Sequence, residues 1–153
     1  MEEIIFKIEA KSESATKTRV KARNFELIID EPKSLGGTDK GANPVEYLLA
    51  SYAGCLSVVA HITAQEKGIV LDDLQISISG NINPERFLGK SKKERAGFKK
   101  INVEITSNAN ISEQAKDEWI REIIERCPVG DNLKNTSEVK INIKQNKLQG
   151  IIS

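Results

Sequence analysis

The feature that most constrains the fold is a long segment between Asn43 and Gly68 that is apolar on nearly all sides. Asn43 is a preferred helix N-cap, Pro44 suits the first helical position, and Glu46 stands where it can close a capping box. Gly68 provides the stop. No charged residue occurs from Tyr47 to Ala60. The helix would be about 35 Å long, more than this chain can bury alone, so the sequence predicts that a partner subunit covers part of it.

Alternating apolar residues on both sides of this segment predict β-strands. The expected strands are residues 4–11, 16–20, 25–29, 74–82, 101–105 and 139–143. Ser112 can cap a second amphipathic helix that Pro128 ends. The glycine-rich stretch 36–43 is expected to be a mobile or ligand-facing loop, and residues 83–97 a long excursion between two strands. Strands separated by two helices, without strict alternation, favour an α+β fold, with residues 1–153 as one domain.

Composition and charge exclude several classes of partner. The chain has 23 basic and 22 acidic residues, so no strong field favours nucleic acid or a membrane surface, and the cluster Lys90–Arg95 is interpreted as a solvated loop. The N-terminus lacks the features of a signal peptide, and the run Tyr47–Ala60 is too short to span a membrane. These observations predict a cytoplasmic protein. A single His and no Cys-x-x-Cys predict no metal, and the glycine spacing predicts no nucleotide cofactor.

Two cysteines, Cys55 and Cys127, fall on core-facing positions of the two predicted helices. Cys127 comes seven residues after Ile120 and so lies on the same buried stripe. A permanent disulfide is not expected in the cytoplasm, so two thiols placed in this way favour transient dithiol redox chemistry. The alternative is that both are inert and pack as small hydrophobes.

Three stretches of the sequence, GGTDKGANPVEYLLA at 36–50, AGCL at 53–56 and RCPV at 126–129, resemble the OsmC/Ohr family of osmotically inducible and organic hydroperoxide resistance proteins. The resemblance spans nearly the whole chain and keeps the order of the motifs. It implies an intertwined homodimer in which antiparallel sheets wrap long central helices, with active sites at the subunit interface. It also implies a thiol peroxidase in which Cys55 reacts with an organic hydroperoxide and Cys127 resolves it. An external dithiol would return the electrons, without a bound cofactor.

The resemblance further implies that an arginine from the N-terminal strands contacts the reactive thiol. Arg19 and Arg23 lie in the matching region and, four residues apart on a strand, would share a face. In peroxidase members an acidic partner of that arginine directly follows Asn-Pro, where this chain has Val45, with Glu46 one place later. On a helix this moves the carboxylate by about 100°. Glu46 therefore either still reaches the arginine or only closes the capping box.

Two other hypotheses stay open beside the peroxidase. The first is a dimer that binds a small molecule or senses redox conditions without efficient turnover, which Val45 favours. The second is a structural stress protein with two inert thiols. Only the resemblance argues against the latter, because both cysteines keep their motif context.

Overall fold

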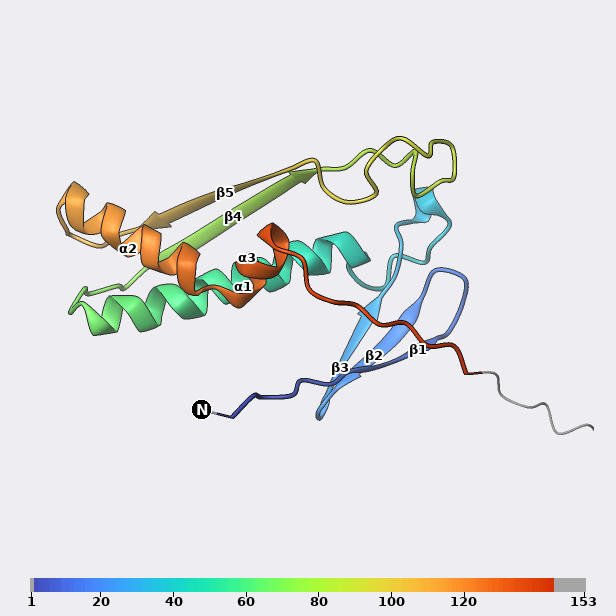
Figure 1. The fold of residues 1–153 in the computed structure, drawn as a ribbon, viewed down its shortest axis with the longest axis horizontal. Coiled ribbons are helices and arrows are strands. Elements are labelled where there is room, and N and C mark those ends of the chain that lie inside the picture. Colours follow the sequence, from blue (N-terminus) through green and yellow to red (C-terminus); the bar gives the residue numbers. More distant parts are fainter. Residues whose placement is uncertain (1, 145–153) are drawn as a thin grey trace, which may run out of the picture.

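The structure of the protein, a computed structural model, describes residues 2–144 and has a mixed α+β architecture, as predicted. Figure 1 shows how its helices and strands are arranged. In chain order they are β1 (Glu9–Ser12), β2 (Thr18–Ala22), β3 (Phe25–Ile29), the 3-10 turn η1 (Lys33–Leu35), α1 (Pro44–Glu66), β4 (Leu74–Asn81), β5 (Lys100–Ser107), α2 (Glu113–Arg126) and α3 (Pro128–Lys134).

The strands form two separate antiparallel sheets, one with the order β1-β2-β3 and one made of β4 and β5. Helix α1 packs against β4, α2 and α3, whereas the described strands β1–β3 make their extensive contacts only with one another. In Figure 1 the three-stranded sheet lies to one side of the helices, beside the N-terminal part of α1, while the β4–β5 hairpin runs along the helices. One hydrogen bond, from the Tyr47 hydroxyl to the Ile28 carbonyl at 2.9 Å, links this sheet to α1. The three helices and the β4–β5 hairpin therefore form the packed part of the fold, where a functional site is expected.

Helix α1 begins and ends as the sequence predicts. The Asn43 side chain accepts a hydrogen bond from the Glu46 backbone N–H at 2.9 Å, and the Glu46 carboxylate accepts one from the Asn43 N–H at 2.8 Å, which completes the capping box. Gly68 follows the helix with a φ of 67°. Among the described residues α1 alone is long and apolar enough to cross a membrane, and a core helix meets the same criteria.

The core lies where α2 crosses α1. Leu56 and Ala60 of α1 are fully buried against Trp119 and Ile123 of α2. The Trp119 indole N–H donates to the Ala60 carbonyl oxygen at 3.2 Å and to the Thr63 hydroxyl oxygen at 3.0 Å. These bonds satisfy a buried polar group and fix the position of α2 along α1.

Two of the predicted strands differ in the structure. Of the predicted strand 4–11 only residues 9–11 are paired, in β1, so that prediction was right only in part, and the prediction of a strand at 139–143 was wrong for the single chain. The side chains of Ile5, Phe6 and Ile141 are 91%, 90% and 83% exposed. A strand needs a neighbouring edge to satisfy its backbone groups, and no described strand pairs with residues 4–8 or 139–143. The sequence prediction also missed α3, because Pro128 not only ends α2 but also occupies the first position of a new helix.

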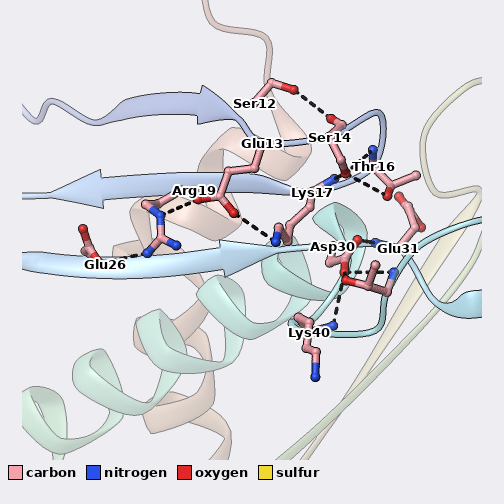
Figure 2. A network of polar contacts seen from close by, with 11 residues as sticks. Ser12, Glu13, Ser14, Thr16, Lys17, Arg19, Glu26, Asp30, Glu31 and Lys40 are labelled. Carbon is pink, nitrogen blue, oxygen red and sulfur yellow. Dashed lines mark hydrogen bonds and ion pairs between the residues drawn. The ribbon is translucent and has the colours of Figure 1, made fainter.

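The glycine-rich loop after β3 is held around one buried carboxylate. Asp30 accepts hydrogen bonds from the Thr38 hydroxyl at 2.5 Å and from the backbone N–H groups of Glu31, Thr38 and Lys40 (Figure 2). The Thr38 hydroxyl contributes most to holding the pKa of Asp30 at about 2, below its usual 3.8. A Cβ on Gly37 would lie 1.7 Å from the Glu31 carbonyl oxygen, so the loop passes too close for any other residue.

Candidate active site at the paired cysteines

The two cysteines meet where α1, α2 and α3 converge. Cys55 lies in the middle of α1, and Cys127 is the single residue between α2 and α3. Both are free thiols, and the Cys127 thiol donates a hydrogen bond to the Cys55 sulfur over an Sγ–Sγ distance of 2.7 Å. A disulfide bond is ~2.0 Å long, so only a small closure separates these atoms from bonding distance. The structure thus brings together the two predicted thiols.

The residues around Cys127 fix its position from both sides. Before it, the Arg126 guanidinium forms a bidentate ion pair with the carboxylate of Glu66 at the end of α1, in which Nη2 donates to Oε1 at 3.0 Å. After it, Pro128 opens α3, and the Cys127 sulfur accepts the Gly130 backbone N–H at 3.2 Å. Cys127 itself takes an extended backbone conformation, with a φ of −84° and a ψ of 108°. The thiol is therefore the N-cap of α3 and is directed at α1.

The two thiols differ in their surroundings. Cys127 is 1% exposed, whereas Cys55 is only half-buried. Burial raises the pKa of the Cys127 thiol, the hydrogen bond to Cys55 raises it further, and the Gly130 N–H opposes both effects. Burial also raises the pKa of the neighbouring Tyr52 hydroxyl, and the two thiols add to this effect. Cys127 therefore keeps its proton, and Cys55 is the thiol that a reactant can reach.

A pocket of about 410 Å³ lies between α1, α3 and the excursion that joins β4 to β5, and neither cysteine lines it directly. Its α1 wall consists of Val45, Leu48 and Tyr52. These residues and Cys55 are three or four positions apart, so they share one stripe of the helix. Gly130 of α3 also lines the pocket, and a Cβ placed on it would lie 3.1 Å from the Tyr52 ring and 3.5 Å from the Cys127 sulfur. The pocket thus adjoins the contact shell of Cys127.

The predicted arginines lie on the three-stranded sheet and have other partners. The Arg19 guanidinium forms ion pairs with Glu13 at 2.6 Å and Glu26 at 3.1 Å (Figure 2). The sequence had suggested that Arg23 shares a strand with Arg19. It does not, because β2 ends at Ala22. Arg23 instead occupies the turn, with a φ of 56°, and its guanidinium lies 5.0 Å from the Phe25 ring centroid. Within residues 2–144 neither arginine forms a hydrogen bond to a cysteine.

Glu46, the other predicted acidic group, is engaged in the capping box of α1. Val45, at the position where the resemblance leads one to expect a carboxylate, lines the pocket instead. In the part of the chain that the structure describes, no three His, Cys, Asp or Glu side chains lie together in a way that could hold a metal ion.

Sequence reasoning missed the contribution of Gly130. For Tyr52 it favoured core packing and left open that the ring lines an apolar pocket. A signal for Gly130 was present. A helix that begins at Pro128 has residue 130 at its third position, where the backbone N–H meets an N-cap side chain. Recognising α3 would have predicted a hydrogen bond to the Cys127 sulfur. In the structure the Tyr52 ring has both roles, because it packs in the core and forms part of the pocket wall.

The chain has counterparts among known proteins. A sequence model described as OsmC-like protein matches residues 37–142. The chain is 31% identical over 121 residues to a hydroperoxide reductase of Mycoplasma genitalium, covering 78% of this chain and 80% of the relative. An OsmC like protein from Mycoplasma pneumoniae has the same fold, with a TM-score of 0.76 at 24% identity, over 94% of this chain and 96% of that one. An organic hydroperoxide resistance protein from Legionella pneumophila has a TM-score of 0.62 at 18% identity, over 86% and 92%.

Proposed function

Because this chain belongs to the OsmC-like protein family, we propose that it is a thiol-dependent peroxidase that reduces organic hydroperoxides in oxidative stress defence. The observation that carries the proposal is the contact between the Cys55 and Cys127 sulfurs at 2.7 Å. Two inert core thiols would not need this direct pairing, whereas a dithiol peroxidase does. The name of the Mycoplasma genitalium relative, hydroperoxide reductase, supports the same reaction.

The proposed reaction has three steps, each balanced within the dithiol and its reactants. The Cys55 thiolate attacks the outer oxygen of the hydroperoxide, the O–O bond breaks, and the leaving alkoxide takes up a proton to become an alcohol. Cys55 is then a sulfenic acid. The Cys127 sulfur attacks the Cys55 sulfur, an S–S bond forms, and the hydroxyl leaves with the Cys127 proton as water. An external dithiol reduces the disulfide by exchange.

The surroundings of the two sulfurs support this order of roles. Cys55 is the more accessible, and Cys127 is buried with a raised pKa. A peroxide needs an accessible, deprotonated sulfur, while a resolving thiol needs only to lie beside the sulfenic acid. We therefore assign the attack to Cys55 and the resolving step to Cys127.

We propose that the active unit is a homodimer. The side chains of Ile5, Phe6, Ile141 and Ile143 are more than 80% exposed in the single chain, as unpaired strands leave them. Val58, on the outer face of α1, is 60% exposed. A second copy of the chain would supply strand edges and cover this helix face. It would also let the three-stranded sheet, whose extensive contacts are only among its own strands, carry Arg19 or Arg23 to the other subunit's Cys55, with Glu46 as the acidic partner.

The proposal is tested by titrating the reduced protein anaerobically with cumene hydroperoxide and analysing the thiols by mass spectrometry. We expect one disulfide between Cys55 and Cys127, formed with one equivalent of peroxide and reversed by a dithiol. Cys55→Ser abolishes peroxide consumption. Cys127→Ser consumes one equivalent and leaves oxidised Cys55, because no resolving thiol is present. If the reduced dimer consumes no peroxide, the peroxidase proposal is wrong.

One observation favours a second candidate, a dimer that binds a small molecule or senses redox conditions. Glu46 is held in the capping box and Val45 faces the pocket, so within residues 2–144 neither position supplies a carboxylate to Arg19 or Arg23. The same titration separates the two. A sensor forms the disulfide once but shows no sustained turnover when dihydrolipoamide is supplied as dithiol, whereas a peroxidase continues to consume peroxide.

A further inference from the structure

The pocket that Tyr52 and Gly130 line combines apolar side chains with exposed basic side chains, which form its rim. Its apolar lining includes Val45, Leu48 and Tyr52. The charged side chains that line it are Arg95, Lys99, Lys100 and Lys134, and no acidic side chain among residues 2–144 lines it. This distribution is not expected from a chain whose basic and acidic residues are nearly equal in number, 23 against 22. The sequence alone had suggested that the basic cluster containing Arg95 is only a solvated loop.

The rim charges come from three parts of the fold. Arg95 lies on the excursion between β4 and β5, Lys100 is the first residue of β5, and Lys134 is the last residue of α3. Lys99 is paired with Glu94 at 2.5 Å. Within residues 2–144, by contrast, Arg95, Lys100 and Lys134 form no ion pair. Three exposed cations with no acidic partner therefore converge on one opening.

We propose that this rim is an anion subsite that makes the protein select hydroperoxides with a carboxylate at the end of a single apolar chain over neutral hydroperoxides. The apolar wall would hold the hydrocarbon body, and Arg95, Lys100 and Lys134 would hold the carboxylate. This proposal rests on the proposed peroxidase function. The pocket volume of about 410 Å³ falls within the range for small-molecule sites and suits one chain rather than a two-chain lipid.

The position of the pocket explains how the subsite would act on the reaction. Tyr52 lines the pocket three residues before Cys55 on α1, and Gly130 lines it while donating its N–H to the Cys127 sulfur. A substrate anchored by its carboxylate at the rim would extend its chain along the α1 stripe toward the thiols. The cations would then act on binding and orientation, without a role in breaking the O–O bond.

The test compares linoleic acid hydroperoxide with its methyl ester, below their critical micelle concentrations. The ratio of kcat/KM for acid over ester is measured for the native protein and for Lys100→Gln and Lys134→Gln. Lys93→Gln is the matched control, because Lys93 is exposed on the same excursion but does not line the pocket. We expect each rim variant to lower the ratio about two- to fivefold, and high salt to lower it in the native protein. The control should leave it unchanged.

A binding measurement separates this inference from the proposed function. The corresponding hydroxy acid and its methyl ester carry no peroxide, and calorimetry with the native protein gives their affinities directly. Tighter binding of the acid that is lost in Lys100→Gln and Lys134→Gln supports the subsite, even if no peroxide is turned over. Equal binding and equal kcat/KM for acid and ester, or the same loss in Lys93→Gln, overturns it.

Discussion

Replacing Trp119 by Phe should weaken the packing that holds α2, and with it Cys127, against α1. Trp119 is 2% exposed, and its indole N–H donates to the Ala60 carbonyl and to the Thr63 hydroxyl. Phe keeps an aromatic ring in the core but removes the donor and part of the ring. The Thr63 hydroxyl keeps a hydrogen-bond partner in this variant, because it still donates to the Val59 carbonyl at 2.8 Å.

The expected loss of stability follows from these contacts. The lost hydrogen bond contributes about 1 kcal/mol net, and the missing part of the indole costs about 1 kcal/mol in burial and cavity energy. Trp119→Phe should therefore lower the free energy of unfolding by about 2 kcal/mol. Thr63→Val removes the hydroxyl acceptor, so the double variant should show a coupling energy of about 1 kcal/mol.

Urea denaturation gives the free energy of unfolding of the native protein, the two single variants and the double variant. All are measured at one protomer concentration, because assembly would make the midpoint depend on concentration. The rate of disulfide formation after one equivalent of peroxide is a second readout, and we expect Trp119→Phe to slow it. A loss below about 0.5 kcal/mol, or a coupling energy of zero, would refute the reasoning that these bonds fix α2.

Three further predictions concern other parts of the fold. Hydrogen bonds hold the pKa of Asp30 at about 2 against 3.8, so its stabilising contribution is present above pH 3.8 and is lost as the pH falls toward 2. Asp30→Asn should therefore make the midpoint of urea unfolding depend less on pH between about 2 and 3.8. Gly37→Ala places a Cβ 1.7 Å from a carbonyl oxygen and should lower the melting temperature by several degrees, whereas Gly54→Ala, with no atom within 4 Å, should not. Phe6→Lys should shift sedimentation equilibrium toward the 16.9 kDa monomer, and an unchanged dimer would contradict the proposed role of residues 4–8.

Local signals in the sequence were enough to predict α1 and the placement of both thiols. Asn43, Pro44 and Glu46 act within one turn of the helix, so no tertiary contact is needed to recognise its start. The core-facing positions of Cys55 and Cys127 follow from helical spacing. Their direct contact also required the crossing of α2 over α1, which only the resemblance had implied.

The errors arose where the outcome depends on something other than local pattern. Alternation at 139–143 shows that a strand could bury one face, but it does not show which edge would pair with it. Arg23 was expected on a strand, yet it takes a left-handed backbone conformation that favours glycine or asparagine. In this conformation the Arg23 guanidinium lies over the Phe25 ring, and no pattern in the sequence predicts that contact.

Every strand pair in the described chain joins neighbours in sequence: β1 with β2, β2 with β3, and β4 with β5. The turns of the β1–β2–β3 sheet are short, whereas residues 82–99 separate β4 from β5, so the three-stranded sheet can form earliest during folding. The docking of α2 onto α1 joins residues far apart in sequence, and Trp119 fluorescence reports on that step. Refolding should therefore show a fast change in far-ultraviolet circular dichroism, then a slower change in fluorescence. If two chains must meet to cover the exposed segments, a last phase will accelerate with protein concentration.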